Sequence, residues 1–429
     1  MKRVQYALVA IAVPLTMALV PTAPKPEDVG LSSERLRRVH DAMQRHVDAK
    51  DVSGVVTLVA RKGRIAHFEA QGLMDIEAKK PMPKDGIFRL ASMSKPITGA
   101  AVMMLVEEGK IRLNDPVSRF IPEFKNLNKV ALPKPGAQAG GGGAGRGGAP
   151  GAGGGRGVPP EFDVVSASRE ITIKDLLTHG SGLMSGGLGG SAAPQRSPTD
   201  TLATYIPKLA SVPLDFQPGT LWRYSGQAGF EVLSRVVEVV SGQTFDQFLK
   251  QRLFDPLGMK DTGFFPSADG ASRLVTLYAR QNGELVRNPN QDQGVSKVYF
   301  SGAGGMMSTA VDYLQFAQML LNGGQLNGKR FLSPKTVELM TSNHTGDMVN
   351  GQFGRPARGM GFGLSVQTVL DPVAADLRVG KGTFGWAGGT GVNVDIDPQE
   401  QIVSLFMVQT PAGAMPRDFE NAIWQAIVE

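Results

Sequence analysis

Strand-like segments lie at both ends of this chain, and the segments between them are helical in pattern. Residues 55–60 and 65–70 are apolar runs joined by a four-residue turn, which predicts a hairpin near the N-terminus. Near the C-terminus, the runs at residues 363–369, 391–396 and 402–408 are also typical of strands. We therefore expect an α/β (α+β) fold in which one antiparallel sheet is assembled from the two ends of the chain.

Helical periodicity dominates the rest of the chain. A first helix is predicted from apolar residues spaced three or four apart between Leu36 and Val47, after the capping residues Ser32 and Ser33. Further helices are expected to begin near residue 92 or 94 and reach 109, and at 173–179, 228–240, 245–253, 310–321, 334–340 and 419–428. One interruption is predicted at Asn282-Gly283, a pair typical of a hairpin turn.

The composition limits the chemistry that this chain can perform. With 429 residues, 41% hydrophobic and 20% charged, it has the proportions of a folded globular protein. The absence of Cys excludes disulfides, cysteine nucleophiles and thiolate metal sites, and the five His form no H-E-x-x-H pair. A net charge of +6, without basic runs longer than doublets, is not the footprint of a nucleic-acid-binding protein. Any catalysis must therefore use oxygen or nitrogen groups.

The N-terminus has the order of a secretory signal. Lys2 and Arg3 precede residues 4–20, which carry no charge. Residues 1–23 are therefore predicted to be a signal peptide, cut after Ala18 or Ala23, or an uncleaved N-terminal anchor. No later segment has 18 uncharged apolar residues, so no further membrane contact is expected. We expect an exported protein, periplasmic or secreted.

Residues 133–160 are the most biased segment of the chain. Residues 136–157 alone hold 13 of the 54 glycines, and such a stretch cannot pack a core. It contains a G-x-G-x-x-G match, but no strand precedes the match and no helix follows, so nucleotide binding is not predicted. We expect a disordered insertion within a single domain that spans residues 31–429.

Ser92 and Lys95 form the only S-x-x-K sequence in the chain, at a predicted helix start. One helical turn places the two side chains on the same face. A serine hydroxyl becomes a good nucleophile when a neighbouring base accepts its proton, and a buried lysine can act as that base. Such a tetrapeptide also arises by chance about once in a chain of this length, and most lysines are solvated, so the motif alone leaves a structural role open.

Two further segments could contribute to a site. Tyr224 stands in W-R-Y-S-G before an apolar helix, where a tyrosine most often packs in the core. The glycines of residues 384–391 could bring backbone N–H groups close to a ligand, or could simply begin a strand. No G-x-S-x-G motif is present. His179 is predicted to be a structural side chain that ties a helix end to its loop.

Taken in order, these features resemble the three motifs of the serine β-lactamase and penicillin-binding-protein superfamily. The motifs here are Ser92-x-x-Lys95, Tyr224-Ser225-Gly226 and Trp386-Ala387-Gly388. The resemblance is closest to class C β-lactamases and the related carboxylesterases (family VIII esterases). It extends to residues 108–117, 172–179 and 304–309, and so covers nearly all of residues 31–429.

The resemblance implies a β-lactamase-like fold: an antiparallel sheet flanked by the terminal helices, with an inserted all-helical lobe and the site between them. Ser92 would be the acylated nucleophile, and Lys95 and Tyr224 would share the proton transfers. The backbone N–H groups of Ser92 and Gly389 would form the oxyanion hole. No metal and no organic cofactor is implied.

Two departures from the lactamase motifs narrow the expected substrate. Gly226 stands where the lactamases commonly have Asn, so a side-chain amide that contacts the substrate is absent. Trp386-Ala387-Gly388 replaces Lys-Thr-Gly, so the cation and hydroxyl that help to hold a substrate carboxylate are absent as well. As substrate-binding residues, Trp386, Ala387 and Gly388 would instead offer an apolar wall to an uncharged ester, as in the esterase branch.

We therefore expect a serine carboxylesterase that acts on small, short-chain carboxylic esters, with a small-molecule substrate as its partner. A β-lactamase or D-amino-acid (DD-) peptidase is the first alternative. The second, of another class, is a non-catalytic scaffold protein with the same fold; the presence of Ser92, Lys95 and Tyr224 counts against it.

Overall fold

The computed structural model describes residues 19–134, 162–292, 295–349 and 358–429. Its centre is an eight-stranded sheet with the strand order β12-β13-β14-β15-β16-β1-β2-β3, in which every neighbouring pair is antiparallel. The strands of this sheet are β1 (Gly54–Arg61), β2 (Arg64–Asp75), β3 (Lys80–Pro81), β12 (Met360–Phe362), β13 (Gln367–Val369), β14 (Phe384–Ala387), β15 (Asn393–Asp397) and β16 (Ile402–Met407). The two ends of the chain meet where β1 pairs with β16, with Leu58 opposite Leu405. The predicted assembly of one antiparallel sheet from both ends is confirmed.

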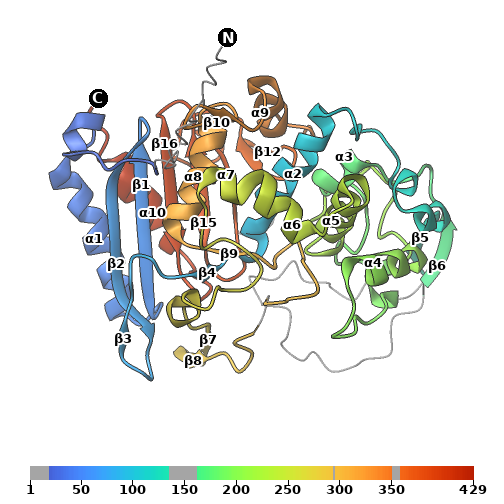
Figure 1. Cartoon of the computed structure of the whole chain (residues 1–429), viewed down its shortest axis with the longest axis horizontal. Coiled ribbons are helices and arrows are strands. Elements are labelled where there is room, and N and C mark those ends of the chain that lie inside the picture. Colours follow the sequence, from blue (N-terminus) through green and yellow to red (C-terminus); the bar gives the residue numbers. More distant parts are fainter. Residues whose placement is uncertain (1–18, 135–161, 293–294, 350–357) are drawn as a thin grey trace, which may run out of the picture.

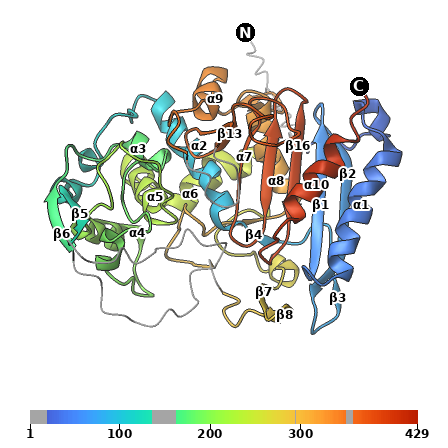
Figure 2. The same ribbon diagram turned by 180° about the vertical axis from the view of Figure 1, so that it is seen from behind.

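The sheet is covered on both faces. Helices α1 (Ser33–Asp48) and α10 (Met415–Trp424) pack side by side on one face, and α8 (Ala310–Leu321) lies across the other (Figures 1 and 2). Because successive side chains of a strand point to opposite faces, β1 contributes to both cores. Val55 and Val59 pack under α1 and α10, whereas Val56 and Leu58 pack on the side of α8.

The remaining helices form a lobe beside the sheet, drawn mainly in green and yellow in Figure 1. The α-helices outside the three that flank the sheet are α2 (Lys95–Glu107), α3 (Ile173–Leu177), α4 (Leu202–Tyr205), α5 (Ala228–Ser241), α6 (Phe245–Leu249), α7 (Asp255–Leu257) and α9 (Pro334–Thr341). Short 3₁₀ turns are η1 (Pro26–Val29), η2 (Ala91–Ser94), η3 (Val117–Arg119), η4 (Pro122–Asn126), η5 (Gly189–Ala192), η6 (Ile206–Ser211) and η8 (Gly270–Arg273), and η7 (Lys250–Phe254) is a π-helical turn. Helix α2 is buried over most of its length and packs against α5.

Four short strand pairs lie outside the main sheet. They are β4 (Phe88–Arg89) with β9 (Met307–Ser308), β5 (Lys129–Pro133) with β6 (Phe162–Ser166), β7 (Tyr278–Gln281) with β8 (Glu284–Arg287), and β10 (Gln325–Leu326) with β11 (Lys329–Arg330). Residues 135–160 of the predicted insertion lie outside the described residues, and β5 and β6 pair across it.

Residues 1–18 of the predicted signal segment are likewise outside the described residues. Residues 19–23, the last part of that segment, lie along β2. The Ala23 N–H donates to the Ile65 carbonyl and the Ile65 N–H to the Pro21 carbonyl, both at 2.8 Å. Cleavage after Ala18 retains these contacts, whereas cleavage after Ala23 removes them. Within the described ranges, no helix is long and apolar enough to cross a membrane.

Two predicted elements were wrong in their bounds. The strand expected at residues 363–369 is a hairpin of β12 and β13, because the Gly363 N–H donates to the Val366 carbonyl and Ser365 has a φ of 80°, which closes a turn. The last helix begins at Met415, four residues earlier than expected, with a proline in its first turn, where the lost N–H costs nothing.

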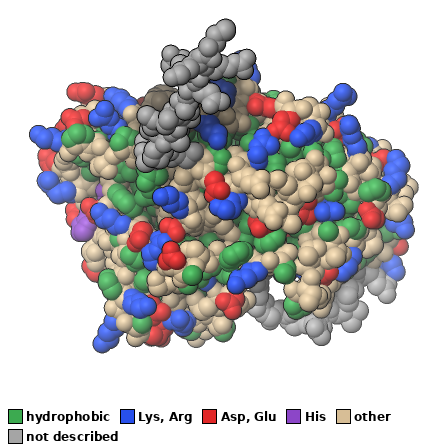
Figure 3. Space-filling view, viewed as in Figure 1, with side chains coloured by type: hydrophobic (Ala, Val, Ile, Leu, Met, Phe, Trp, Pro, Cys, Tyr) green, Lys and Arg blue, Asp and Glu red, His purple; other side chains and the backbone are tan. Residues whose placement is uncertain are grey.

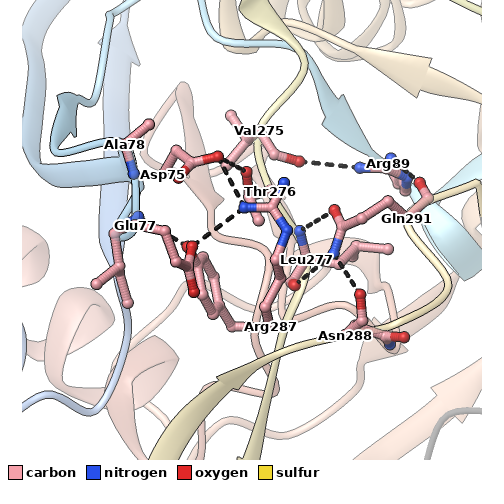
Figure 4. Close-up of polar contacts among 12 residues, drawn as sticks. Asp75, Glu77, Ala78, Arg89, Val275, Thr276, Leu277, Arg287, Asn288 and Gln291 are labelled. Carbon is pink, nitrogen blue, oxygen red and sulfur yellow. Dashed lines mark hydrogen bonds and ion pairs between the residues drawn. The ribbon is translucent and has the colours of Figure 1, made fainter.

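The predicted hairpin at Asn282-Gly283 is confirmed: both residues have positive φ, as a tight two-residue turn requires. Its strand β8 is fixed to the end of β2 by Arg287, which donates to the carboxylates of Asp75 at 2.9 Å and Glu77 at 3.1 Å (Figure 4). On the face of the molecule shown in Figure 3, acidic and basic side chains are similarly interspersed, so no large patch of one sign forms there.

Candidate active site

Ser92 lies on η2, the single turn that joins β4 to the start of α2. Ala91 has a φ of 45°, in the left-handed region that costs energy for a residue with a Cβ, so the turn is tight. The turn is braced by Gln409, just after β16, whose side-chain amide accepts from the Arg89 N–H and donates to the Arg89 carbonyl, both at 3.1 Å. The position of Ser92 is therefore fixed by the core of the sheet.

The three predicted catalytic side chains meet at the hydroxyl of Ser92. Tyr224, in the segment that precedes α5, donates from its hydroxyl to Ser92 Oγ at 2.6 Å. Lys95 Nζ, at the first residue of α2, is 3.0 Å from the same oxygen. Both distances are those of hydrogen bonds, so each neighbour can exchange a proton with Ser92. Ser94 is buried and accepts from the Met306 N–H at 3.3 Å, away from this cluster.

Lys95 is fully buried, and its amine is held by two backbone carbonyls. Nζ donates to Gly226 O and to Ala303 O, both at 2.7 Å. Two hydrogens are thereby used, and the third position of Nζ faces Ser92 Oγ. An ammonium group donates there, whereas a neutral amine presents its lone pair to the serine proton. The same geometry therefore accommodates Lys95 with and without its extra proton.

The segment after β14 lies against the turn that carries Ser92. A Cβ added to Gly388 would come within 2.2 Å of the Leu90 carbonyl oxygen, so glycine is required for this close approach. Thr390 donates from its hydroxyl to the Arg89 carbonyl at 2.8 Å. Between them, Gly389 is exposed, and a Cβ built there would meet nothing within 4 Å. The predicted second oxyanion donor therefore lies beside the Ser92 turn with open space in front of it.

Aromatic rings form one wall of the site. Trp386 on β14 lies 5.5 Å from the Tyr224 ring and 5.3 Å from the Phe362 ring, centroid to centroid. His179 packs among them at 4.5 Å from the Tyr224 ring. Ala387 and Gly388 continue from Trp386 towards Ser92, so the predicted substrate-binding residues are brought to the same place.

His179 is a structural side chain, as predicted, but it lies closer to the site than its sequence context indicated. It has a φ of 58°, is fully buried, and accepts from the Ser225 N–H at its Nδ1, at 3.2 Å. Burial, and then the charge of Lys95, lower the pKa of His179 well below its ordinary value. His179 is therefore neutral at physiological pH and holds the backbone next to Tyr224.

Sequence patterns did not reveal every group that contacts the catalytic cluster. The carbonyls of Gly226 and Ala303 are backbone atoms, which carry no residue signature. Phe362 comes from a strand whose bounds were misplaced. Among the described residues, no three His, Asp or Glu side chains form a group that could hold a metal ion.

Comparison with known proteins assigns the family. A model of the family described as Beta-lactamase matches residues 39–428. The chain belongs to this family. Among curated proteins of similar sequence, Protein Rv1367c of Mycobacterium tuberculosis (strain ATCC 25618 / H37Rv) is 36% identical over 374 residues, which cover 84% of this chain and 87% of that protein. Esterase EstB of Burkholderia gladioli is 30% identical over 438 residues, which cover 96% and 98%.

The fold of this beta-lactamase-family member is shared with a solved structure. EstCE1, described as a hydrolase with promiscuous acyltransferase activity, aligns with a TM-score of 0.72 and 26% identity over 91% of this chain and 99% of its own. The predicted β-lactamase-like fold and the resemblance to its esterase relatives are confirmed.

Proposed function

We propose that this protein is a serine hydrolase that cleaves small carboxylic esters with short acyl chains through an acyl intermediate on Ser92. The observation that carries the proposal is the contact of Ser92 Oγ with both Lys95 Nζ and Tyr224 OH. Similarity to Esterase EstB over nearly the whole of both chains supports the ester as substrate class.

Acylation begins with attack of Ser92 Oγ on the ester carbonyl carbon. The proton of Ser92 passes to the Lys95 and Tyr224 pair, and the carbonyl oxygen becomes an oxyanion. The backbone N–H groups of Ser92 and Gly389 are the donors assigned to that oxyanion. When the tetrahedral intermediate collapses, the alcohol leaves with the proton that Tyr224 returns.

Deacylation repeats these steps with water in place of the serine hydroxyl. The proton of the water passes to the Lys95 and Tyr224 pair, and the oxygen attacks the acyl carbon. Collapse returns a proton to Ser92 Oγ and releases the carboxylic acid. Both half-reactions use the same pair in its two protonation states, as its hydrogen bonds permit.

The wall of the site favours an uncharged substrate. Trp386 is 6% exposed and packs edge to face against Phe362. Gly226 offers its carbonyl to Lys95 and has no side chain to contact an amide. A charge-assisted hydrogen bond to a carboxylate is worth about 1.5–3 kcal/mol, so a site without that cation should bind β-lactams and peptide termini weakly.

Three substrates assayed side by side test the proposal: a p-nitrophenyl short-chain ester, a chromogenic cephalosporin and a D-Ala-D-Ala peptide. We expect kcat/KM for the ester to exceed the other two by at least about tenfold. Efficient cephalosporin or peptide cleavage at or above the ester value would assign the lactamase or peptidase activity instead. No turnover of any of the three would favour the scaffold reading.

We also propose that the protein is exported to the periplasm or secreted. The support is the order of Lys2 and Arg3 before the uncharged residues 4–20. Expression of the full chain in a Gram-negative host, followed by fractionation and N-terminal sequencing, tests this. A mature protein that begins at residue 19 in the periplasmic fraction is expected. Full-length protein confined to the cytosol would contradict export.

A further inference from the structure

A second carboxylate lies close to the catalytic cluster and takes no part in the steps above. Glu231, in the first turn of α5, is 7% exposed and accepts hydrogen bonds from Tyr299 OH at 2.8 Å and Ser301 Oγ at 2.7 Å. Burial raises the pKa of Glu231 above its ordinary value, and the two hydroxyl donors and the charges of Arg196 and Lys95 oppose that rise. Two hydroxyl donors, one to each oxygen, suit an ionised carboxylate.

The segment that Glu231 holds is the one that holds Lys95. Residues 299–303 run from the two hydroxyl donors to Ala303, whose carbonyl accepts from Lys95 Nζ at 2.7 Å. Between them, the Gly302 N–H donates to Ser234 Oγ at 3.1 Å, and Thr98 donates to the Gly302 carbonyl at 2.8 Å.

Glycine at position 302 is required for this packing. A Cβ there would lie 2.2 Å from Ser234 Oγ and 2.5 Å from Thr98 Oγ1. The segment is thus clamped between α2 and α5 with no room to shift, and Glu231 fixes its first half.

We propose that Glu231 is a positioning residue for Lys95: it fixes the 299–303 segment that binds the lysine amine, and it keeps a negative charge near that amine. The inference rests on the proposed function, in which Lys95 and Tyr224 share the proton of Ser92. Through the segment, Glu231 sets where Lys95 Nζ lies. Through its charge, Glu231 favours the protonated form of the pair.

The sign of the electrostatic effect follows from the groups that surround Glu231 and Lys95. Arg196 lies 4.2 Å from the Tyr299 ring centroid and offsets part of the carboxylate charge, while Tyr205 and Tyr299 are neutral because burial raises the pKa of each. On the side of Lys95, His179 is neutral. Removal of the Glu231 charge therefore disfavours the most protonated form of the catalytic pair. The acidic limb of the pH profile should then move to lower pH.

The experiment is the pH dependence of Ser92 labelling by a fluorophosphonate, measured together with kcat/KM for a p-nitrophenyl ester. Glu231→Gln keeps the size and one acceptor oxygen but removes the charge. We expect the midpoint of its acidic limb to move down by about 0.5–1 pH unit. Glu238→Gln is the matched control: Glu238 lies on the same helix and pairs with Arg235 instead, so its profile should equal that of the wild type.

A second variant tests the positioning role without removing the charge. Ser301→Ala deletes one anchor of the segment and leaves Tyr299 on Glu231. We expect its plateau rate to fall by about three- to tenfold, with the midpoint unchanged. Glu231→Asp keeps the charge on a shorter side chain and should behave like Ser301→Ala, which also covers the case in which Glu231→Gln does not fold.

Profiles of Glu231→Gln that superimpose on the wild type would overturn the electrostatic half of the proposal. Wild-type plateau rates in both Ser301→Ala and Glu231→Asp would overturn the positioning half. Labelling reports on Ser92 whatever the natural substrate is. A wild-type protein that is labelled at Ser92 but cleaves no ester would therefore contradict the proposed function while leaving the role of Glu231 measurable.

Discussion

At the scale of single residues, the central feature is a serine with two proton-exchanging neighbours. Tyr224 OH and Lys95 Nζ lie 2.6 and 3.0 Å from Ser92 Oγ, and no histidine takes part, since His179 bonds the Ser225 N–H instead. If Lys95 is charged, Tyr224 accepts the serine proton as a phenolate. If Lys95 is neutral, it accepts the proton itself and Tyr224 donates to the serine oxygen. The pair therefore titrates as one unit.

Single and double substitutions test that unit. Lys95→Ala and Tyr224→Phe should each lower kcat/KM by at least about 100-fold, and the double variant should be little worse than the worse single one, because the two act together. Wild-type kcat/KM should rise from mildly acid to mildly alkaline pH as the basic form of the pair grows. Additive losses in the double variant, or a Tyr224→Phe profile identical to the wild type, would show that a different group is the base.

Much of the site was predictable at this scale, and the reason is local. Ser92 and Lys95 are one helical turn apart, and a short spacing survives in any fold. Tyr224 and Gly389 could be assigned only by resemblance, because nothing in the sequence shows that segments far apart along the chain meet. The carbonyl of Ala303 and the carboxylate of Glu231 were not predicted: one is a backbone atom, and the other is one of many acidic residues on helices.

At the scale of elements, the site depends on how closely β14 approaches the turn η2. Gly388 makes the approach possible, and the hydroxyl of Thr390 fixes it. Strand β14 itself pairs with β13 and β15 in the middle of the C-terminal half of the sheet. The oxyanion donor is therefore as rigid as the sheet that carries it.

Two adjacent glycines provide a matched test of this approach. Gly388→Ala places a Cβ 2.2 Å from the Leu90 carbonyl oxygen and should displace the 388–390 segment, lowering kcat by about 100-fold or more, as loss of an oxyanion donor does. Gly389→Ala keeps its backbone N–H and meets nothing within 4 Å, so it should retain most of its activity. Steady-state kinetics on the same ester decide the matter; equal activity in the two variants would contradict the assignment.

The β5–β6 hairpin makes the predicted insertion removable. Pro133 and Phe162 are paired in register, so a short Gly-Ser linker can join them. We expect this variant to be soluble, with a melting temperature close to that of the wild type, because a glycine-rich segment buries little apolar surface. Loss of soluble protein would contradict the prediction. A changed preference for substrate size with unchanged stability would show that the segment overhangs the site.

At the scale of the whole molecule, the two ends of the chain support each other as well as the sheet. His46 near the end of α1 bonds Asp51 at 2.7 Å and Asp418 on α10 at 2.8 Å. Burial by itself would lower the pKa of His46, but the two carboxylates outweigh it and raise the pKa above its ordinary value. The protonated ring thus holds the first and last helices together across the sheet face that they cover (Figure 2).

This bridge gives the fold a pH dependence of known sign. Because the folded-state pKa of His46 is raised, its contribution to stability is complete below the unfolded value of about 6.5 and is lost as pH rises through the folded value. The melting temperature should therefore fall from pH 6 to pH 9 by roughly 1–3 °C more in the wild type than in His46→Gln. Calorimetry on both proteins measures the difference, and parallel curves would contradict the bridge.

The overall topology was predictable because it rests on the period of the apolar pattern and on where that pattern lies. Strands at both ends and helices between leave few ways to close a sheet. The order of the strands within it, and the division of residues 363–369 into two strands, were not predictable. Those features depend on tertiary pairing and on a turn at Ser365 whose positive φ is unusual for serine.

The most direct measurement is the mass of the protein during turnover. Rapid quenching of the wild type with a short-chain ester should give a species heavier by one acyl group, and peptide mapping should place that group on Ser92. Ser92→Ala, which keeps its fold, should show neither the acyl adduct nor more than a trace of ester hydrolysis. An acyl group on another residue such as Ser94, or full activity in Ser92→Ala, would contradict the account at its centre.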